Sequence, residues 1–232
     1  NDKTNPKRKA ICDKSKYNES YLDKLSSSLD FCRNFMMHSD DSPVTKVENC
    51  EDAIEKLNFI PVFIPNKLVN VSEFLDEMNV DGLILSGGDN IGDFPERDSI
   101  EKAIIDYGIK KKLPLFGVCR GMQIINNYFG GTIITTSDQK HVNTSHTVKI
   151  VNTSSHQILD SKSIEVNSFH NNLINSNVLS KDLEPFALAT DNTVEGFFHK
   201  SLPIVGVMWH PERSQNETNK EILSKVFHRP NF

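Results

Sequence analysis

A cysteine stands at the centre of the segment Gly117-Val-Cys-Arg-Gly121, directly after an apolar run and directly before a helical pattern. A Gly-x-Cys-x-Gly corner between a strand and a helix has the form of a nucleophile elbow, because the glycines permit a tight turn that projects the central side chain. The thiol of Cys119 would also lie at a helix N-terminus, where backbone N–H groups and the helix dipole favour the thiolate. The alternative is a buried core cysteine, so a base is needed to decide between the two.

The segment Trp209-His-Pro-Glu212 supplies such a base after another apolar run. In an extended segment residues i and i+2 point the same way, and Pro211 stiffens the stretch between them. The Glu212 carboxylate can therefore accept a hydrogen bond from the His210 ring, which leaves the other ring nitrogen for a thiol. Cys119, His210 and Glu212 are accordingly the predicted catalytic residues.

Paired glycines mark a third place where chemistry is expected, Ser86-Gly-Gly88, again directly after an apolar run. Such a pair leaves backbone N–H groups accessible at the end of a strand. The N–H of Gly88 and that of Arg120, the residue after the cysteine, are predicted to form an oxyanion hole. A Gly-Gly pair by itself indicates only a turn, so this assignment depends on the other two motifs.

Alternating strand and helix patterns are needed to bring the three segments together. Apolar, β-branched runs predict strands, in chain order, over 59–64, 82–86, 113–118, 147–151, 164–166, 185–189, 194–198 and 204–209. Helical periods predict helices over 47–57, from Asn70 with Glu73 as a capping pair, from Asp98 with Glu101 as a second pair to about Lys111, over 122–128, and over 216–227.

This alternation predicts an α/β fold: a doubly wound, mostly parallel sheet with helices on both faces. A hairpin turned at Asp191-Asn192 adds a small antiparallel extension. In such sheets ligands bind beyond the carboxyl ends of the strands, where all three motifs fall. Residues 1–46 are polar and weakly patterned, so we expect a poorly readable N-terminal segment followed by one domain over 47–232.

Composition excludes several classes of protein. The formal net charge of −5 over 232 residues offers no basic field for a nucleic acid. No apolar segment approaches the ~20 residues that span a bilayer, and the first thirty residues lack the apolar core of a secretory signal, so a cytoplasmic protein without a membrane partner is expected. No C-x-x-C pair occurs, so neither a zinc site nor a disulfide framework is indicated for the four cysteines, Cys12, Cys32, Cys50 and Cys119. We expect no metal and no organic cofactor.

The three motifs, in this order and spacing, resemble the class I glutamine amidotransferase-like superfamily, whose members have a flavodoxin-like sheet and cleave γ-glutamyl amides with a Cys-His-Glu triad. The resemblance covers about Phe59 to Phe227. Four features are similar to the γ-glutamyl-γ-aminobutyrate hydrolase branch of free-standing hydrolases: Cys-Arg-Gly, the pair Arg97-Asp98 before a helix, Val166-Asn-Ser-Phe-His170, and Gly206-Val-Met-Trp-His-Pro-Glu212. The compact form also resembles γ-glutamyl-CDP-amidate hydrolases of capsule phosphoramidate synthesis.

Two departures from the branch alter the rim that would recognise the leaving group. The branch usually has His-His-Gln where this chain has His170-Asn-Asn172, and the loop after the glycine pair is reduced to residues 89–96. The stretch before Val47 is also longer and less regular than the first strand and helix of the family.

The resemblance also implies substrate contacts. Gly87 and Gln123 would help to hold the γ-glutamyl group, and the segment Asn167, Ser168, Phe169 and His170 would contact its α-amino and α-carboxylate ends. The alternatives are a helix-surface amide for Gln123 and a loop histidine bonded to the backbone for His170. Glu195, His141 and His146 stand where members of the family have polar groups near the cleft. Ordinary roles on the protein surface are an equally open alternative for these three residues.

The implied reaction is hydrolysis of a small γ-glutamyl substrate through a γ-glutamyl thioester, with release of glutamate. One alternative is a glutaminase subunit or domain that delivers ammonia to a synthase partner, and a homodimer also stays open. A further alternative is a catalytically silent binding module of the same fold. Arg97, Arg120 and His141 could meet an anionic leaving group, although solvated loop charges are the alternative for the first and last.

Overall fold

The computed structural model of the chain describes residues 62, 64–151, 158–214 and 216–228. The N-terminal segment 1–46 and the helix expected over 47–57 lie outside the described residues, as does most of the strand expected over 59–64. The two described residues of that strand, Val62 and Ile64, are not in a strand.

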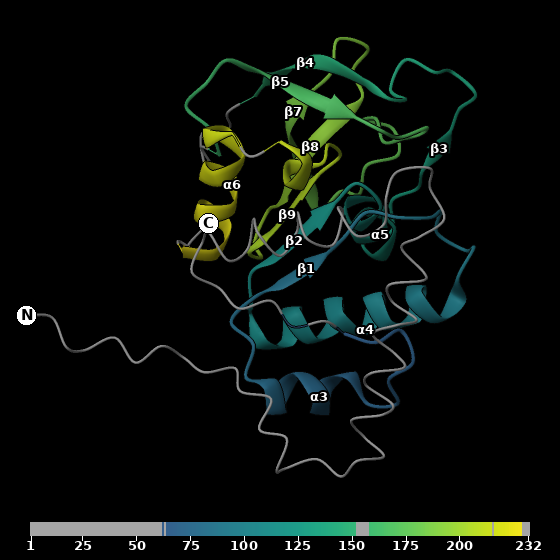
Figure 1. Cartoon of the computed structure of the whole chain (residues 1–232), viewed down its shortest axis with the longest axis vertical. Helices are drawn as coiled ribbons and strands as arrows, with labels where there is room; N and C mark the ends of the chain where they lie inside the picture. Colours follow the sequence, from purple (N-terminus) through teal and green to yellow (C-terminus); the bar gives the residue numbers. More distant parts are fainter. Residues whose placement is uncertain (1–61, 63, 152–157, 215, 229–232) are drawn as a thin grey trace, which may run out of the picture.

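A seven-stranded sheet, in the order β1-β2-β9-β8-β7-β4-β5, forms the centre of the molecule (Figure 1). Strands β1, β2 and β9 are parallel, and every later neighbour in this order pairs antiparallel. The strands are β1 (Leu83–Leu85), β2 (Leu115–Val118), β4 (Thr144–Ile150), β5 (Ser163–Ser168), β7 (Leu183–Leu188), β8 (Val194–His199) and β9 (Ile204–Val207). A separate antiparallel pair joins β3 (Ile134–Thr135) to β6 (Asn172–Leu173).

The expected α/β class is confirmed, and the antiparallel part is larger than expected. Within the described residues it comprises four strands, because β4 pairs with both β5 and β7 and so continues the sheet beyond the hairpin. The hairpin of β7 and β8 turns at Asp191-Asn192 as expected, with Asn192 in the left-handed region at φ 65°. In Figure 1, β4 and β5 lie at the end of the molecule opposite α3 and α4.

Helices cover both faces of the sheet. The helices are α3 (Val71–Met78), α4 (Pro95–Lys111), α5 (Arg120–Tyr128) and α6 (Glu217–His228), with a short 3-10 turn η2 (Pro211–Arg213). Leu115 and Ile204 pack in one core with α3, α4 and α5, whereas Phe116 and Val205 pack in a second core with α6. Successive residues of a strand point to opposite faces, so a strand buried on both faces is a continuous apolar run.

Two glycines let α5 approach the sheet closely. Gly117 on β2 is in register with Gly206 on β9. A Cβ on Gly117 would lie 2.7 Å from the carbonyl oxygen of Gly121, and one on Gly206 would lie 2.9 Å from Cγ of Met122. Side chains at either position would push α5 outward, so this pair helps to set where the helix begins.

The start of α3 is the one expected from the sequence. Asn70 is its N-cap, and the side-chain oxygen of Asn70 accepts a hydrogen bond from the Glu73 N–H at 3.1 Å. The side-chain amide of Asn70 in turn donates to the Glu73 carboxylate at 2.9 Å. The capping pair is therefore confirmed.

The second expected capping pair is wrong. Helix α4 begins at Pro95, with Phe94 as its N-cap, so Asp98 and Glu101 lie inside the helix. Both carboxylates form ion pairs with the guanidinium of Arg120, on α5. Asp98 also accepts a hydrogen bond from the Gly92 N–H, before the helix, at 2.8 Å, so the two carboxylates bind Arg120 and the preceding loop and do not form the expected capping pair.

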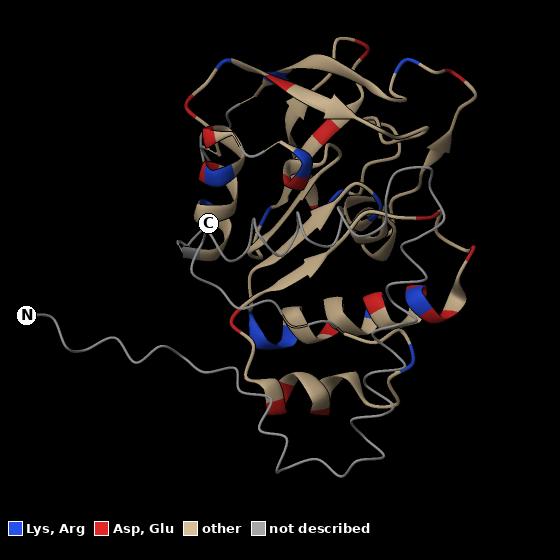
Figure 2. Ribbon diagram, viewed as in Figure 1, with Lys and Arg blue, Asp and Glu red and all other residues tan. Residues whose placement is uncertain are grey.

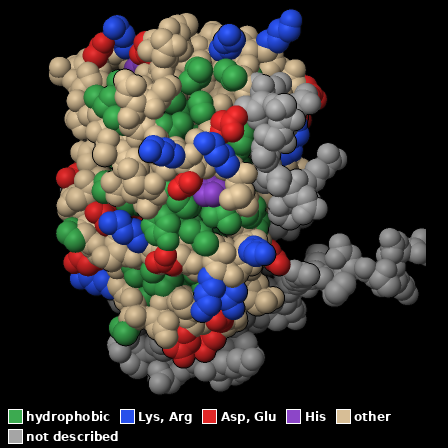
Figure 3. All heavy atoms as spheres, turned by 180° about the vertical axis from the view of Figure 1, so that it is seen from behind, with side chains coloured by type: hydrophobic (Ala, Val, Ile, Leu, Met, Phe, Trp, Pro, Cys, Tyr) green, Lys and Arg blue, Asp and Glu red, His purple; other side chains and the backbone are tan. Residues whose placement is uncertain are grey.

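Charged side chains of both signs are mixed along the elements (Figure 2). On the described part of the reverse face, Lys and Arg also alternate with Asp and Glu around hydrophobic side chains (Figure 3). Within the described ranges, no helix combines the length and the hydrophobicity that crossing a lipid bilayer requires.

Candidate active site

Cys119 connects β2 to α5 in a strained backbone conformation, with φ 50° and ψ −103°. A residue with a side chain is uncommon at positive φ, and such strain costs about 1–3 kcal/mol and gathers at functional sites. The Cys119 N–H donates to the Val207 carbonyl on β9 at 2.8 Å, and its own carbonyl accepts from the Gln123 N–H at 3.0 Å. The strand, corner and helix are therefore arranged as the motif predicts, with Cys119 7% exposed.

His210 lies just beyond β9, and its Nδ1 is 2.6 Å from Oε1 of Glu212, in the η2 turn. Burial lowers the pKa of His210, but interactions with the Cys119 thiol and the Glu212 carboxylate outweigh it and raise this pKa to about 9. The imidazolium is therefore the favoured form of His210 at neutral pH.

Gly87 lies beside both the cysteine and the histidine. A Cβ on Gly87 would be 2.8 Å from Cε1 of His210 and 3.7 Å from Cβ of Cys119. A larger residue would displace the imidazole, so the absence of a side chain lets the ends of β1, β2 and β9 meet. The neighbouring Gly88 is exposed and has φ 145°.

The backbone of His210 is held by the side chain of Asn167, at the end of β5. The His210 N–H donates to Oδ1 of Asn167 at 2.8 Å, and Nδ2 of Asn167 donates to the His210 carbonyl at 2.9 Å. The ring of Phe169 lies 5.9 Å from the His210 ring, and Arg213 stacks over Phe169 at 4.1 Å. Sequence reasoning missed this pairing, because no local pattern relates residues 43 positions apart.

Ser168 and His170 point into the protein. Oγ of Ser168 donates to the His141 carbonyl at 2.8 Å, and Nδ1 of His170 donates to the Asn172 carbonyl at 3.0 Å. The two residues are 0% and 4% exposed. His170 is therefore bonded to the backbone, as in the alternative reading of this residue. Either side chain would have to rearrange before it could contact a substrate.

Gln123 is 3% exposed, so the helix-surface alternative for this residue is wrong. Its Oε1 accepts from Nδ2 of Asn172 at 3.4 Å, and its Nε2 donates to Sδ of Met208 at 3.6 Å. Nδ2 of Asn172 also donates to Asn90 at 2.7 Å. Asn172 is one of the positions that depart from the family pattern, and it links the elbow helix to the shortened loop.

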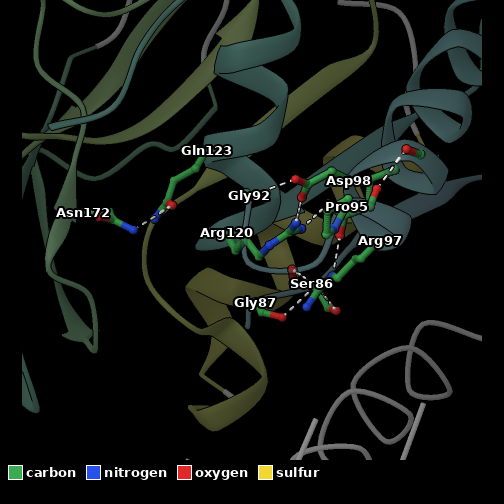
Figure 4. A network of polar contacts seen from close by, with 11 residues as sticks. Ser86, Gly87, Gly92, Pro95, Arg97, Asp98, Arg120, Gln123 and Asn172 are labelled. Carbon is green, nitrogen blue, oxygen red and sulfur yellow. Dashed lines mark hydrogen bonds and ion pairs between the residues drawn. The ribbon is translucent and has the colours of Figure 1, made fainter. Parts of the chain in front are cut away.

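A buried ionic network lies behind the elbow and the glycine pair (Figure 4). Arg120 is paired with Asp98 and Glu101, and Nε of Arg97 donates to Glu101 at 2.8 Å. Nη2 of Arg97 donates to the carbonyls of Ser86 and Gly87, each at 3.0 Å. The network thus fixes the Ser86-Gly87 backbone to α4, and α4 to the first residue of α5.

The network corrects the expectation for Arg97 and Arg120. Arg97 is 6% exposed, so it is not a solvated loop charge. Both guanidiniums are engaged by carboxylates or backbone carbonyls, which removes the support for their meeting an anionic leaving group. The adjacent pair Arg97-Asp98 was the only sequence signal for this network.

Glu195 and His141 are 0% and 4% exposed, so surface roles are wrong for both, and His146 is partly buried beside them.

Residues 31–212 match the family model described as Peptidase C26. The chain belongs to the Peptidase C26 family. It is 36% identical over 155 residues to the γ-glutamyl-CDP-amidate hydrolase of Campylobacter jejuni, and this match covers 64% of this chain and 70% of that protein. It is 31% identical over 168 residues to a glutamine-hydrolyzing GMP synthase subunit of Methanococcus aeolicus, and this match covers 69% of this chain and 81% of that protein.

The crystal structure of a Thermoplasma acidophilum protein, described as a candidate GMP synthase subunit, has the same fold. The TM-score is 0.64 at 25% identity, over 78% of this chain and 86% of that one. Peptidase C26 membership and these relatives support hydrolase chemistry of the glutamine amidotransferase class.

Proposed function

We propose that this Peptidase C26 member is a cysteine-dependent hydrolase of γ-glutamyl amide bonds, of the γ-glutamyl-amine or γ-glutamyl-CDP-amidate type. The observation that carries the proposal is the convergence of Cys119, Gly87 and the His210–Glu212 pair at the ends of three adjacent parallel strands. Similarity to the C. jejuni hydrolase supports the substrate class.

In the proposed mechanism the Cys119 thiolate attacks the γ-carbonyl carbon, and the electron pair of the C=O bond moves onto oxygen. Collapse of this tetrahedral intermediate breaks the C–N bond, and His210 gives its proton to the departing nitrogen. Neutral His210 then takes a proton from water, which attacks the thioester carbonyl. Glutamate leaves, and the thiolate and imidazolium are restored.

The backbone N–H groups of Gly88 and Arg120 are proposed to stabilise the oxyanion. Gly88 is exposed at the end of β1, and Arg120 is the first residue of α5, where N–H groups have no partner within the helix. The side chain of Arg120 is directed to α4, so only its main chain takes part. Glu212 orients His210 and stabilises its charged form.

Gly87, Asn167 and Phe169 remain the proposed substrate contacts. Gln123 is buried and bonded to Asn172 and Met208, so its contact with a substrate would require rearrangement, as for Ser168 and His170. Asn167 and Phe169 are only partly buried and lie against His210. We expect these two residues to support the histidine as well as any ligand.

The central test is Cys119→Ser. Because a serine hydroxyl is far less ionised than a thiol, turnover of γ-glutamyl substrates should fall by about 10³-fold or more, with the far-UV CD spectrum unchanged. An electrophilic glutamine analogue should also label Cys119 selectively, which would show that the sulfur is reachable despite its small exposed area. Retained turnover in the variant would contradict the proposal.

A glutaminase component of a larger synthase is the second candidate function, and similarity to GMP synthase subunits supports it. The two functions differ in leaving group and in dependence on a partner. The isolated chain should be assayed on glutamine, γ-glutamyl-GABA and γ-glutamyl-CDP-amidate in parallel. A free-standing hydrolase should prefer a large leaving group without a partner, whereas a glutaminase should act on glutamine and be stimulated by its synthase.

A further inference from the structure

Three histidines surround one buried carboxylate in the antiparallel part of the sheet. Glu195 on β8 is 0% exposed. The histidines come from two other stretches of the chain: His141 lies just before β4, His146 is on β4, and His170 lies just after β5. Oε1 of Glu195 lies 3.5 Å from Nδ1 of His141, 3.6 Å from Nε2 of His146 and 3.5 Å from Nε2 of His170. We call these four residues the His₃Glu cluster.

Hydrogen bonds outside the cluster fix the tautomers of two of the rings. Nδ1 of His170 faces the Asn172 carbonyl at 3.0 Å, and a carbonyl only accepts, so Nδ1 bears the hydrogen. Nε2 of His141 faces the Asp191 carboxylate at 2.9 Å and bears the hydrogen for the same reason. In neutral rings, Nδ1 of His141 and Nε2 of His170 therefore turn lone pairs toward Glu195.

The inward atoms of the cluster gather in one buried space. The three inward nitrogens and both Glu195 oxygens are buried and have no hydrogen-bond partner among the described residues. The rings of His141 and His170 lie against each other, with their centroids 4.9 Å apart. One dication among these atoms would contact the inward nitrogens and Glu195, and would balance the charges of Glu195 and Asp191.

The spacing fits a tetrahedral metal ion. In a tetrahedron with Zn–N and Zn–O bonds of the usual length, ligand atoms lie about 3.4 Å apart, close to the distances from Oε1 of Glu195. The ligand atoms of His141, His170 and Glu195 all lie within 4.8 Å of one another, and Nε2 of His146 lies 3.6 Å from Oε1 of Glu195, which makes it available as a fourth ligand. Asp191 and the Asn172 carbonyl occupy the places of the outer groups that orient metal-binding histidines.

The geometry points to a structural site for Zn²⁺ or a similar divalent transition metal, with His141, His146, His170 and Glu195 as its ligands. Four protein ligands leave no open position, so the ion would hold structure and would not activate water. It would fasten β4 and β8 to the segment that follows β5. That segment begins directly after Asn167 and Ser168 of β5, and Asn167 holds the backbone of His210.

Metal content and affinity test the site independently of any enzymatic activity. The full chain is stripped with a chelator and titrated with Zn²⁺, and with Co²⁺ as a spectroscopic probe. We expect one ion per chain by elemental analysis, a tetrahedral-type visible spectrum of the Co²⁺ form, and a higher melting temperature with metal. Glu195→Gln should weaken Zn²⁺ binding by at least about 100-fold, and Asp191→Asn by about 10- to 100-fold.

Glu184→Gln is the matched control, because Glu184 is a carboxylate on the neighbouring strand β7 outside the cluster. Its affinity for Zn²⁺ should equal that of the unaltered chain. If Glu195→Gln does not fold, His146→Asn replaces it, since the His146 side chain is already 19% exposed. Failure of the unaltered chain to bind one equivalent of Zn²⁺ or Co²⁺ would overturn the site. Equal binding by the cluster variants and the control would also overturn it.

Discussion

Two local features define the geometry of the candidate active site. The elbow holds Cys119 at φ 50°, and Oε1 of Glu212 lies 2.6 Å from Nδ1 of His210. Together the thiol and the carboxylate raise the pKa of His210 to about 9 against the opposing effect of burial. The residue proposed to donate a proton to the leaving nitrogen is therefore favoured in its protonated form at neutral pH.

This pKa predicts the alkaline limb of the pH profile. Because His210 donates a proton in the acylation step, kcat/KM should fall as the pH rises through about 9. Glu212→Gln removes one of the interactions that raise this pKa, so the limb should move to lower pH and kcat/KM at neutral pH should fall by about 10- to 100-fold. Glu217→Gln, an exposed carboxylate on α6, is the control. A limb that stays in place in Glu212→Gln would show that Glu212 does not act on His210.

The sequence predicted the contacts of a functional residue where its partners are close to it along the chain. The spacing of His210 and Glu212 predicted their hydrogen bond, and the glycines beside Cys119 predicted its strained corner. The family resemblance placed Asn167 against the substrate, and the structure shows that its amide also pairs with the backbone of His210. That pairing depends on where β5 ends relative to β9, which no local pattern contains.

Helix α4 connects the elements that carry the proposed oxyanion hole. Its first two turns provide Arg97, which holds the carbonyls of Ser86 and Gly87, and Glu101, which pairs with both Arg97 and Arg120. One carboxylate thus stands between the loop after β1 and the start of α5. All of these charged groups are buried, so removal of one leaves its partners uncompensated.

Glu101→Gln tests this positioning role. Loss of the charge should cost about 3–5 kcal/mol of unfolding free energy, because buried Arg97 loses its carboxylate partner and buried Arg120 keeps only Asp98. At a temperature where the variant is fully folded, kcat should fall by about 10-fold or more with little change in KM, since the oxyanion donors shift while other contacts remain. Glu96→Gln, exposed on the same helix, should change neither quantity. If kcat of Glu101→Gln equals that of the parent chain, Glu101 stabilises the fold and does not position the oxyanion donors.

Helix boundaries show where local rules hold. Asn70 and Glu73 cap α3 as predicted, because each side chain bonds within this one turn: Asn70 accepts from the Glu73 N–H and donates to the Glu73 carboxylate. Asp98 and Glu101 have the same spacing, yet they turn to Arg120 and the helix starts at Pro95. A buried arginine is a stronger partner for a carboxylate than a helix end is.

The parallel and antiparallel parts of the molecule share their cores. Leu183, Val194 and Phe197 from β7 and β8 pack in the same core as the residues of α3, α4 and α5. The second core likewise joins Phe116 on β2 to Phe186 on β7. One sheet and two shared cores make the described part of the chain a single packing unit.

For the whole molecule, sequence patterns predicted the fold class and the order of the elements better than the size of the antiparallel part of the sheet. Alternating strands and helices predicted the α/β class and the convergence of three strand ends, because those depend on chain order alone. The pairing of β4 with β7, and with it the His₃Glu cluster, depends on the register of strands distant in sequence. The family resemblance left positions near the cleft open for Glu195, His141 and His146, but no local pattern joined them with His170 in one cluster.

Shared cores predict one cooperative unfolding transition. Leu75→Ala on α3 and Phe186→Ala on β7 remove fully buried side chains from opposite ends of the molecule, and should cost about 2–5 and 3–5 kcal/mol. Each should shift the same transition, followed in parallel by far-UV CD and by fluorescence of Trp209, which packs beside Phe186. If the two ends were independent, the CD curve would split and Leu75→Ala would leave the Trp209 transition in place. Coincident shifts in both variants would show that the elements carrying Cys119 and those carrying Glu195 fold as one body.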